Sequence, residues 1–258
     1  MAKTLGVPRP DQASYMLRAA SEEAGRAYKR QLLDLLDLRP GHTVLDVGCG
    51  PGTDLPALAE RVGAAGRVIG VDQDPAMLAT ARERTAAAHT VEIREADAHA
   101  LPVAPGTVDR AKIDRVLMHV RSPSEVLAQL HTATRPGARV GLVEPDWDTL
   151  AVDAEDLETS RAFTRYTTEK VVRHATVGRG LARLAVGAGF RVETVLATTP
   201  VFTDFEHGDH TLGLGRNTQQ AVADGHIDRG RGEAWFDGLA HGPFYASFTL
   251  VTVVCSRP

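Results

Sequence analysis

The sequence predicts a doubly wound α/β fold, with a mostly parallel sheet of seven strands, an antiparallel last strand and helical lid insertions. Two observations support this class. Short runs rich in β-branched residues alternate with runs rich in Ala, Leu and Arg from residue 43 to residue 143, and this alternation is typical of βαβ units. The 258 residues suffice for one large domain with insertions, so we expect a single domain over residues 1–258.

Strand and helix signals follow one another through the first half of the chain. Strands are expected where Val, Ile and Thr dominate a short run, and helices where apolar residues recur at three- and four-residue intervals. In chain order we expect strand 43–47, helix 54–62, strand 67–71, helix 76–87, strand 90–95, strand 108–116, helix 123–134 and strand 139–143. These elements define an expected ligand-binding core over residues 42–144.

The remaining segments are expected to cover this core. Apolar residues at helical spacing over 15–38 end at an Arg-Pro-Gly break, and residues 11–38 therefore predict an N-terminal helical cover. After residue 144 the pattern gives a polar helical stretch at 153–174, a helix at 178–188, a strand at 190–198, an irregular segment at 204–241 and a last strand at 244–255. Residues 150–176 and 204–241 are expected to be lid insertions, because α/β domains place such segments at the carboxyl ends of strands.

Composition excludes several classes of protein. A formal net charge of −4 argues against a nucleic-acid partner, since proteins of that kind concentrate positive charge. Cys49 and Cys255 form no CxxC pair, so neither a disulfide framework nor a thiolate zinc site is indicated. No uncharged stretch reaches the roughly 18 to 20 residues that a membrane span needs. We expect a cytoplasmic protein without a membrane or nucleic-acid partner, and leave open whether it is a monomer or a homodimer.

The run VLDVGCGPGT at 44–53 ends the first expected strand in alternating glycines. Gly48, Gly50 and Gly52 permit backbone conformations closed to other residues and let a ligand lie against the main chain. The spacing is GxGxG rather than the dinucleotide pattern GxGxxG. Asp46 and Asp54 place carboxylates on both sides of the turn, which disfavours a phosphate and predicts a ligand with a cationic portion. An ordinary βα turn is the alternative.

Three motifs together resemble the class I S-adenosylmethionine-dependent methyltransferases. VLDVGCGPGTDL is similar to the first motif of that family, VIGVDQDPAML to the second and READAHALP to the third. The resemblance implies a Rossmann-like fold and S-adenosyl-L-methionine as cofactor. This molecule carries an ammonium, a sulfonium and a neutral ribose and adenine, so it also satisfies the demand for a cationic ligand without phosphate.

The family resemblance also implies roles for individual residues. Asp72 would accept the ribose hydroxyls, Gln73 would lie beside the adenosine and Met77 near the adenine, while Asp97 would face the adenine amino group and Ala98 would offer its backbone. Asp72 could instead cap the following helix, Asp97 could be a turn residue and Met77 a core residue. The cofactor site is expected to include, in addition, Tyr15, Asp46, Gly48, Gly50, Gly52, Asp114 and Arg115.

The fourth strand ends in KIDRVLMHV, which lacks the NPPY-like, DPPY-like and PC motifs of base- and RNA-modifying relatives. It resembles the ubiquinone/menaquinone-type and natural-product branch of small-molecule methyltransferases, with a DRxLxH motif at 114–119 and EPDW at 144–147. The resemblance implies methyl transfer to a small molecule with oxygen, nitrogen or carbon as acceptor. An enzyme that binds the cofactor but catalyses a cyclisation or pericyclic step without methyl transfer remains the alternative.

His119 and Glu144 are the expected catalytic residues. An imidazole titrates in the range that suits a general base, and Glu144 could orient it or bind a cationic acceptor, with Asp146 in reserve. His119 could instead be structural, and both acids could cap the next segment. Trp147 could form an acceptor wall or pack in the core, and Arg115 could hold an anionic acceptor or pair with a neighbouring acid.

The stretch DFEHGDH at 204–210 contains residue types that bind metals. Its glycine suggests a loop without helical spacing between the histidines, so we expect a solvated lid loop and no metal.

Overall fold

The computed structural model describes residues 23–258 and, for side chains, residues 26–258. Within this range the sheet has eight strands, seven of which follow the order β3-β2-β1-β4-β5-β8-β6, while β7 pairs with β8 beside that path. The strands are β1 Thr43–Val47, β2 Arg67–Asp72, β3 Val91–Glu95, β4 Val108–Asp114, β5 Thr134–Val152, β6 Arg191–Thr198, β7 Val201–Phe202 and β8 Ala246–Ser256.

The pairing confirms a mostly parallel sheet with an antiparallel last strand. Strands β1 to β5 pair in parallel, whereas β8 runs antiparallel to both of its neighbours, β5 and β6. The expected number of seven strands is wrong by one, because β7 adds a strand of two residues. A strand of this length is too short to show periodicity, and its pairing with β8 defines it.

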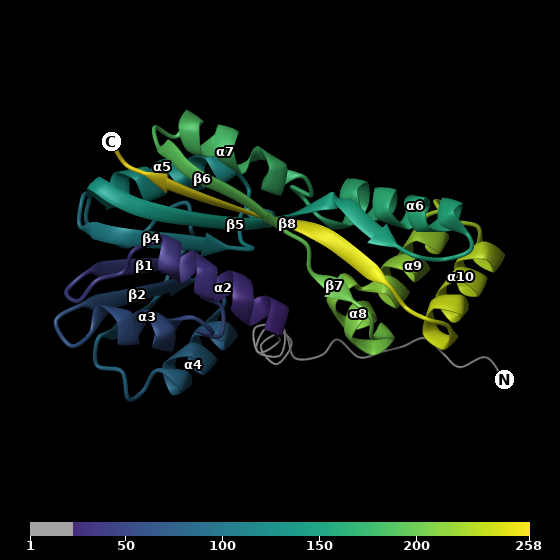
Figure 1. Cartoon of the computed structure of the whole chain (residues 1–258), viewed down its shortest axis with the longest axis horizontal. Helices are drawn as coiled ribbons and strands as arrows, with labels where there is room; N and C mark the ends of the chain where they lie inside the picture. The colour runs from purple at the N-terminus through teal and green to yellow at the C-terminus, as the bar shows by residue number, and fades with distance from the viewer. Residues whose placement is uncertain (1–22) are drawn as a thin grey trace.

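Helices cover both faces of the sheet (Figure 1). Buried leucines of α2, α3 and α4 pack in one apolar cluster, and those of α5 and α7 pack in a second cluster on the other face. No helix within residues 23–258 is long and apolar enough to cross a bilayer. The helices are α2 Glu23–Leu35, α3 Leu55–Val62, α4 Pro75–Arg84, α5 Pro123–Ala133, α6 Leu157–Tyr166, the π-helix η1 Thr167–Val171, α7 Val177–Gly187, α8 Phe205–Leu212, α9 Leu214–Ala223 and α10 Arg229–His241.

Sequence signals explain where several of these helices begin. Proline occupies the first turn of α3, α4 and α5, where its missing N–H costs nothing. The Asp74 carboxylate accepts hydrogen bonds from the backbone N–H groups of Ala76 and Met77 and so caps α4. Ser122 caps α5 in the same way through the N–H of Glu125.

Strand β5 is much longer than expected. The sequence predicts a strand that ends at residue 143, but β5 continues to Val152 and pairs with β8 along most of its length, with a bulge between Asp146 and Ala151. The polar stretch EPDWDT hides this extension because strand formation here depends on pairing with β8, which lies about a hundred residues further along the chain. Figure 1 shows β5 and β8 running together out of the core into the lid.

The segments expected to form a lid, here called the lid, are built around this two-stranded extension. Figure 1 places α6, α8, α9 and α10 together at the far end of β5 and β8. Phe163 of α6 packs on Trp235 of α10 with ring centroids 5.2 Å apart, and Phe202 stacks on Phe248 at 6.0 Å. These aromatic residues belong to the same apolar cluster as the helices α2 to α4, so core and lid form one folded body.

The expectation of an irregular segment over 204–241 is wrong, since it forms α8, α9 and α10. Asp204 caps α8 by accepting a hydrogen bond from the His207 N–H at 2.8 Å. Gly208, which suggested a loop, lies inside α8, where a Cβ atom would come within 2.3 Å of the Phe244 ring. The glycine is therefore explained by close packing rather than by chain reversal. The prediction of a helical stretch over 153–174 is confirmed by α6 and η1.

The first turn of α7 contacts the backbone of β5, and this contact can be tested. A Cβ atom at Gly178 would lie 2.8 Å from the carbonyl oxygens of Glu144 and Pro145. We expect Gly178→Ala to lower the free energy of unfolding by about 1–3 kcal/mol, because helix and strand would have to separate. Gly187→Ala in the same helix meets nothing within 4 Å and should change stability by less than about 1 kcal/mol. Urea denaturation of both variants measures the difference, and equal stabilities would contradict the contact.

Candidate active site

The predicted site residues gather at the carboxyl edge of the parallel strands. The glycine turn follows β1, Asp72 ends β2, Asp97 follows β3, Asp114 ends β4 and Glu144 lies in β5. In the order β3-β2-β1-β4-β5, strands β1 to β3 are added toward one edge of the sheet, and β4 and β5 are added toward the other. The strand order therefore reverses between β1 and β4. Open α/β sheets bind ligands in the crevice at such a point, so the sequence expectations and the topology agree on the location.

The glycine turn requires glycine for conformation and for packing. Gly48, Gly50 and Gly52 have φ angles of 71°, 52° and 74°. A Cβ atom at Gly48 would lie 2.2 Å from the Val116 side chain, which approaches from the loop after β4. The first glycine therefore fits the turn against residues 115–120, and these two loops can lie in contact only because it has no side chain.

The backbone N–H groups of this turn donate hydrogen bonds to acceptors within the protein. Gly48 and Cys49 both donate to the Val71 carbonyl, at 2.7 and 3.0 Å, and Gly52 donates to the Cys49 carbonyl at 3.0 Å. Gly50 donates to Oδ2 of Asp72 at 2.8 Å. A phosphate-binding turn directs such groups at its ligand. This turn does not, which fits a ligand whose adenosine portion carries no phosphate.

Asp72 lies beside the turn and is partly exposed. Its Oδ1 accepts a hydrogen bond from the Asp74 N–H at 3.0 Å, and its Oδ2 accepts one from Gly50. Asp74, not Asp72, caps α4. Each Asp72 oxygen keeps a further lone pair, so the carboxylate can still accept two hydroxyl groups. Gln73 next to it is exposed, and Met77 is buried at the start of α4.

Asp97 and Ala98 lie on the loop after β3. The Asp97 side chain is 55% exposed, and Ala98 is half buried. Asp97 Oδ1 accepts hydrogen bonds from both the backbone N–H and the ring Nδ1 of His99, and these bonds hold the pKa of Asp97 below its usual value. The carboxylate is therefore ionised and fixed in place on an exposed loop, as an adenine contact would need.

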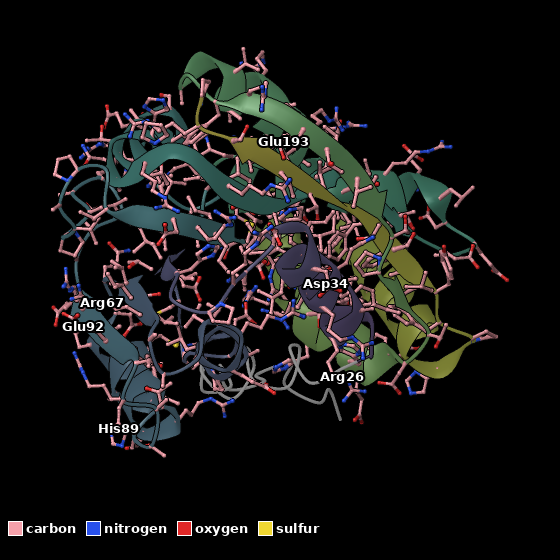
Figure 2. The ribbon with its side chains drawn as sticks, turned by 60° about the vertical axis from the view of Figure 1, so that its left-hand side comes forward. Arg26, Asp34, Arg67, His89, Glu92 and Glu193 are labelled. Atoms are coloured by element: carbon pink, nitrogen blue, oxygen red, sulfur yellow. The ribbon has the colours of Figure 1, made fainter. Side chains whose placement is uncertain are left out.

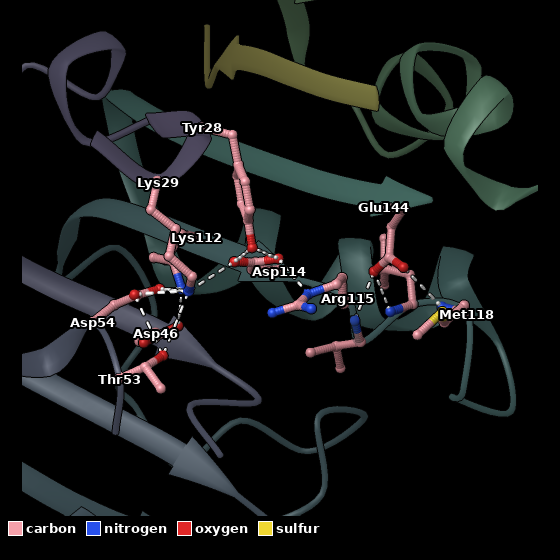
Figure 3. Close-up of polar contacts among 12 residues, drawn as sticks. Tyr28, Lys29, Asp46, Thr53, Asp54, Lys112, Asp114, Arg115, Met118 and Glu144 are labelled. Carbon is pink, nitrogen blue, oxygen red and sulfur yellow. Dashed lines mark hydrogen bonds and ion pairs between the residues drawn. The ribbon is translucent and has the colours of Figure 1, made fainter. Parts of the chain in front are cut away.

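Below the glycine turn lies a buried network of ion pairs (Figure 3). The Lys112 Nζ of β4 lies 2.8 Å from Asp46 Oδ1 and 2.8 Å from Asp54 Oδ2. The Lys29 Nζ of α2 lies 2.7 Å from Asp54 Oδ1. Although burial opposes a positive charge, the carboxylates raise the pKa of Lys112, so it stays protonated.

These contacts change the argument from the two acids that flank the turn. Asp46 is only 1% exposed, and its carboxylate is bound to Lys112. Asp54 is neutralised by Lys29 and Lys112, so the two acids do not create the negative surface that disfavours phosphate. The exclusion of phosphate stands on a different observation, the internal use of the turn's N–H groups.

The network continues to Asp114 at the end of β4. The Lys29 Nζ lies 3.2 Å from Asp114 Oδ2, and the Tyr28 hydroxyl donates to the same oxygen at 3.1 Å. Burial raises the pKa of Tyr28 to about 12, so the phenol remains protonated as a donor. Asp114 is thus buried and bound by two residues of α2, contacts that the sequence did not predict. Figure 3 shows Arg115 beyond it, with Nε 3.3 Å from Asp114 Oδ1.

Sequence reasoning missed Tyr28, Lys29 and Lys112. Lys112 carried a usable signal, because a lysine within a strand covered on both faces must find a counter-ion. Nothing local marked Lys29, whose partners lie 25 and 85 residues further along the chain. Tyr15, expected to close over the cofactor, lies outside the described residues.

Arg115 turns the chain sharply after β4. It has a φ of 58°, which is unusual for a residue with a side chain, and its N–H donates to the Val143 carbonyl at 2.8 Å. The guanidinium is partly exposed, at 27%. Backbone strain of this kind is often found at functional sites, and here it sets the direction of the loop over residues 115–120.

Glu144 holds this loop from below. Its buried carboxyl group accepts hydrogen bonds from the backbone N–H groups of Val116 at 2.7 Å, Leu117 at 2.5 Å and Met118 at 3.3 Å (Figure 3). Burial raises its pKa to about 8, although the three N–H donors act in the opposite direction. Among the described residues no hydrogen bond joins Glu144 to His119, so the expectation that it orients the imidazole receives no support.

His119 is exposed at the end of the loop. Its backbone N–H donates to the Val116 carbonyl at 2.9 Å, and this hydrogen bond closes a turn. Partial desolvation, together with Arg115 nearby, lowers the pKa of His119 below its usual value. The imidazole is therefore neutral at pH 7 and can accept a proton.

Asp146 and Trp147 follow Glu144 on β5. Asp146 is paired with the Arg179 guanidinium of α7, Nη2 to Oδ1 at 2.9 Å, so it is a structural acid rather than a free one. The Trp147 indole N–H donates to the Met118 sulfur at 3.4 Å, and its ring lies 4.9 Å from Phe248. Trp147 therefore joins the loop over 115–120 to the aromatic lid.

The stretch at 204–210 contains residue types that bind metals, but the side chains of Asp204 and Asp209 accept hydrogen bonds from backbone N–H groups. Asp204 caps α8, and Asp209 Oδ1 accepts a hydrogen bond from the Gly215 N–H at 2.7 Å. In the part of the chain that the structure describes, no group of three His, Cys, Asp or Glu residues could hold a metal ion.

Two relatives in sequence are informative. An uncharacterised 37.1 kDa protein in transposon TN4556 of Streptomyces fradiae is 49% identical over 95% of this chain and 71% of its own length. A 2-phytyl-1,4-naphthoquinone methyltransferase of Thermosynechococcus vestitus is 36% identical over 45% of this chain. The chain spans only 52% of that enzyme's length, so the similarity covers about half of it.

Solved structures of the same fold include two enzymes with different named activities. A geranyl diphosphate methyltransferase in complex with S-adenosylmethionine superposes with a TM-score of 0.60 at 20% identity, covering 98% of this chain and 94% of the enzyme. A [4+2]-cyclase superposes with a TM-score of 0.60 at 17% identity, covering 93% and 83%. At these identities the similarity shows the fold. The family model described as a methyltransferase domain matches residues 38–198, and the chain therefore belongs to this family of S-adenosylmethionine-dependent methyltransferases.

Proposed function

We propose that the protein transfers the methyl group of S-adenosylmethionine to a small organic acceptor seated between residues 115–120 and the lid. The observation that carries this proposal is the turn at 48–52. All its N–H groups named above are satisfied internally, while the adjacent Asp72 keeps acceptor capacity on both oxygens. A ribose that carries two free hydroxyls and no phosphate fits this arrangement.

Residues around the turn would hold the cofactor. Asp72 would accept the ribose hydroxyls, Gln73 and Met77 would flank the adenosine and Asp97 would accept from the adenine amino group. When bound, the cofactor supplies an electrophilic methyl group on a sulfonium. The chain's task is then to hold the acceptor in line with that group, since alignment supplies much of the rate in a displacement of this kind.

The acceptor side would combine an aromatic residue and one base. Trp147 is partly exposed, and it connects the loop to the lid through its contacts with buried Met118 and Phe248. The relative named as a naphthoquinone methyltransferase acts on a ring system of aromatic type, and these side chains would suit a similar acceptor. His119 lies on the same loop as Met118 and would remove a proton from a hydroxyl or an acidic carbon.

Glu144 would act by positioning rather than by chemistry. Its carboxyl group is buried and accepts three backbone N–H groups of the loop that carries His119. A buried group with these partners does not reach an acceptor, but it fixes where the loop lies. Glu144 would therefore influence turnover through the placement of His119 and Met118.

A cyclisation or pericyclic reaction without methyl transfer is the second candidate, because a [4+2]-cyclase shares the fold. Formation of S-adenosylhomocysteine distinguishes the two. Mass spectrometry of reactions with quinone and phenol acceptors should detect this product together with an acceptor heavier by one methylene. Substrate turnover with the cofactor left intact would favour the cyclase-type activity instead.

The cofactor assignment predicts a specific loss of binding. We expect Asp72→Ala to weaken the affinity for S-adenosylhomocysteine by about 10- to 100-fold, because two charge-assisted hydrogen bonds to the ribose are lost. Asp74→Asn keeps a side-chain cap on α4 and should bind within about threefold of the original chain. Calorimetric titration measures both. A wild-type chain that does not bind S-adenosylhomocysteine would contradict the proposed function.

The role of His119 predicts a loss of turnover without a loss of binding. We expect His119→Ala to reduce kcat by about 100-fold with an acceptor that must lose a proton, while the cofactor affinity stays unchanged. His89 is exposed at the periphery (Figure 2), just before β3 at the opposite edge of the sheet, and His89→Ala serves as control. Normal turnover of His119→Ala at pH 7 would remove it from the mechanism.

Glu144 predicts a characteristic pH dependence of stability. Its pKa of about 8 in the folded state lies above the ordinary value of 4.5, so the folded chain binds a proton that the unfolded chain releases. This contribution to stability is complete below pH 4.5 and is lost as pH rises toward 8, at up to about 1.4 kcal/mol per pH unit. Glu144→Gln should abolish this decline, whereas exposed Glu60→Gln should keep it. Unfolding curves of wild type and Glu144→Gln that run parallel from pH 5 to 8 would exclude the effect.

A further inference from the structure

His99 connects two loops of the site. Its ring Nδ1 lies 2.6 Å from Asp97 Oδ1, and its ring Nε2 lies 3.1 Å from the Ser122 backbone N. Asp97 follows β3, and Ser122 begins α5 directly after the loop that carries His119. The His99 side chain is only 11% exposed although Asp97 beside it is 55% exposed, so the imidazole fills the space between the loops.

The two partners determine the form of the imidazole. A backbone N–H can only donate, so the Nε2 that faces Ser122 must act as acceptor and carry no proton. The proton of a neutral ring then sits on Nδ1, where it is donated to the Asp97 carboxylate. The His99 backbone N–H also donates to Asp97 Oδ1, at 2.9 Å. One carboxylate oxygen, Oδ1, therefore accepts both hydrogen bonds from His99, and Oδ2 takes part in neither.

Charged groups nearby do not replace this contact. Arg121 precedes Ser122 and acts on Asp97 only through its long-range charge. Its guanidinium Nη2 is bound to Glu125 at 3.1 Å on the surface of α5. His99 is thus the side chain that ties the Asp97 carboxylate to another element of the fold.

We propose that His99 is a positioning residue for adenine recognition: as the Nδ1–H tautomer, it holds the Asp97 carboxylate at a fixed place relative to the start of α5. The proposal rests on the proposed contact between Asp97 and the adenine amino group. A carboxylate on an exposed loop pays conformational entropy when it binds a ligand, and the bridge to Ser122 removes part of that cost beforehand.

Substitutions of His99 can remove one of its two ring hydrogen bonds and keep the other. Asn can place an amide N–H near the position of Nδ1 and keep the bond to Asp97, whereas Gln can place an amide oxygen near Nε2 and keep only the bond from Ser122. We expect His99→Ala and His99→Gln to weaken S-adenosylhomocysteine binding by about tenfold and His99→Asn by less than about threefold. Calorimetric titration at pH 7.5 measures these affinities, and melting temperatures establish that the variants are folded.

A double-mutant cycle tests whether His99 acts through Asp97. We expect His99→Ala to have no further effect on affinity in the Asp97→Ala background. The loss should also disappear for S-inosylhomocysteine, in which a carbonyl oxygen replaces the adenine amino group. Additive losses in the cycle, or equal losses for both ligands, would overturn the proposal.

The tautomer gives a readout that needs no variant and no ligand. Nitrogen-15 NMR of the imidazole should show His99 protonated at Nδ1 and unprotonated at Nε2, and the opposite tautomer would overturn the proposal. Normal S-adenosylhomocysteine affinity of His99→Ala would also overturn it, while the cofactor assignment would stand. Absence of binding by the wild-type chain would instead refute the proposed function.

Discussion

The site depends on the buried ion pairs that Lys29 and Lys112 make with Asp46, Asp54 and Asp114. These residues come from α2, from β1, from the start of α3 and from β4, so one set of charges fixes four elements around the glycine turn. Charges of both signs are needed, because an unpaired charge in this position would cost several kcal/mol. The ion pairs neutralise the acids that flank the turn, and the proposed cofactor surface lies above them, at Asp72, the glycine backbone and Asp97.

A second set of contacts fixes the loop at which the acceptor is proposed to bind. Glu144 accepts three N–H groups of the loop after β4, and Val116 from that loop packs on Gly48. The turn that faces the cofactor and the loop that carries His119 are therefore built against each other. Beyond Glu144, the long pairing of β5 with β8 carries Trp147 toward the aromatic lid. The loop and the lid, between which the acceptor is proposed to bind, are thus connected through nearby residues of one strand, Glu144 and Trp147.

Local patterns predicted the core elements well and the lid poorly. The strands at 43–47, 67–71 and 90–95 and the helices that begin with proline each follow from residues within the element, because covered strands and capped helices have short-range signals. The outer half of β5 and the two-residue β7 form only by pairing with β8. Gly208 was misleading for the same reason, since its purpose is to admit the distant Phe244 ring.

The sequence by itself determined the fold class and the cofactor, and it predicted which residues gather at the carboxyl edge of the sheet. Glycines with special conformations and acids that end strands act through their own backbone, so their spacing carries this information. Only the tertiary structure decided which of these acids are buried in ion pairs. Asp46 and Asp114 look equivalent to Asp72 in the sequence, but Lys112 and Lys29 neutralise them from distant positions in the chain. The position of Lys112 in a covered strand predicts that it needs a counter-ion, but no local pattern shows which acid supplies it, because charge compensation in the interior is a three-dimensional property.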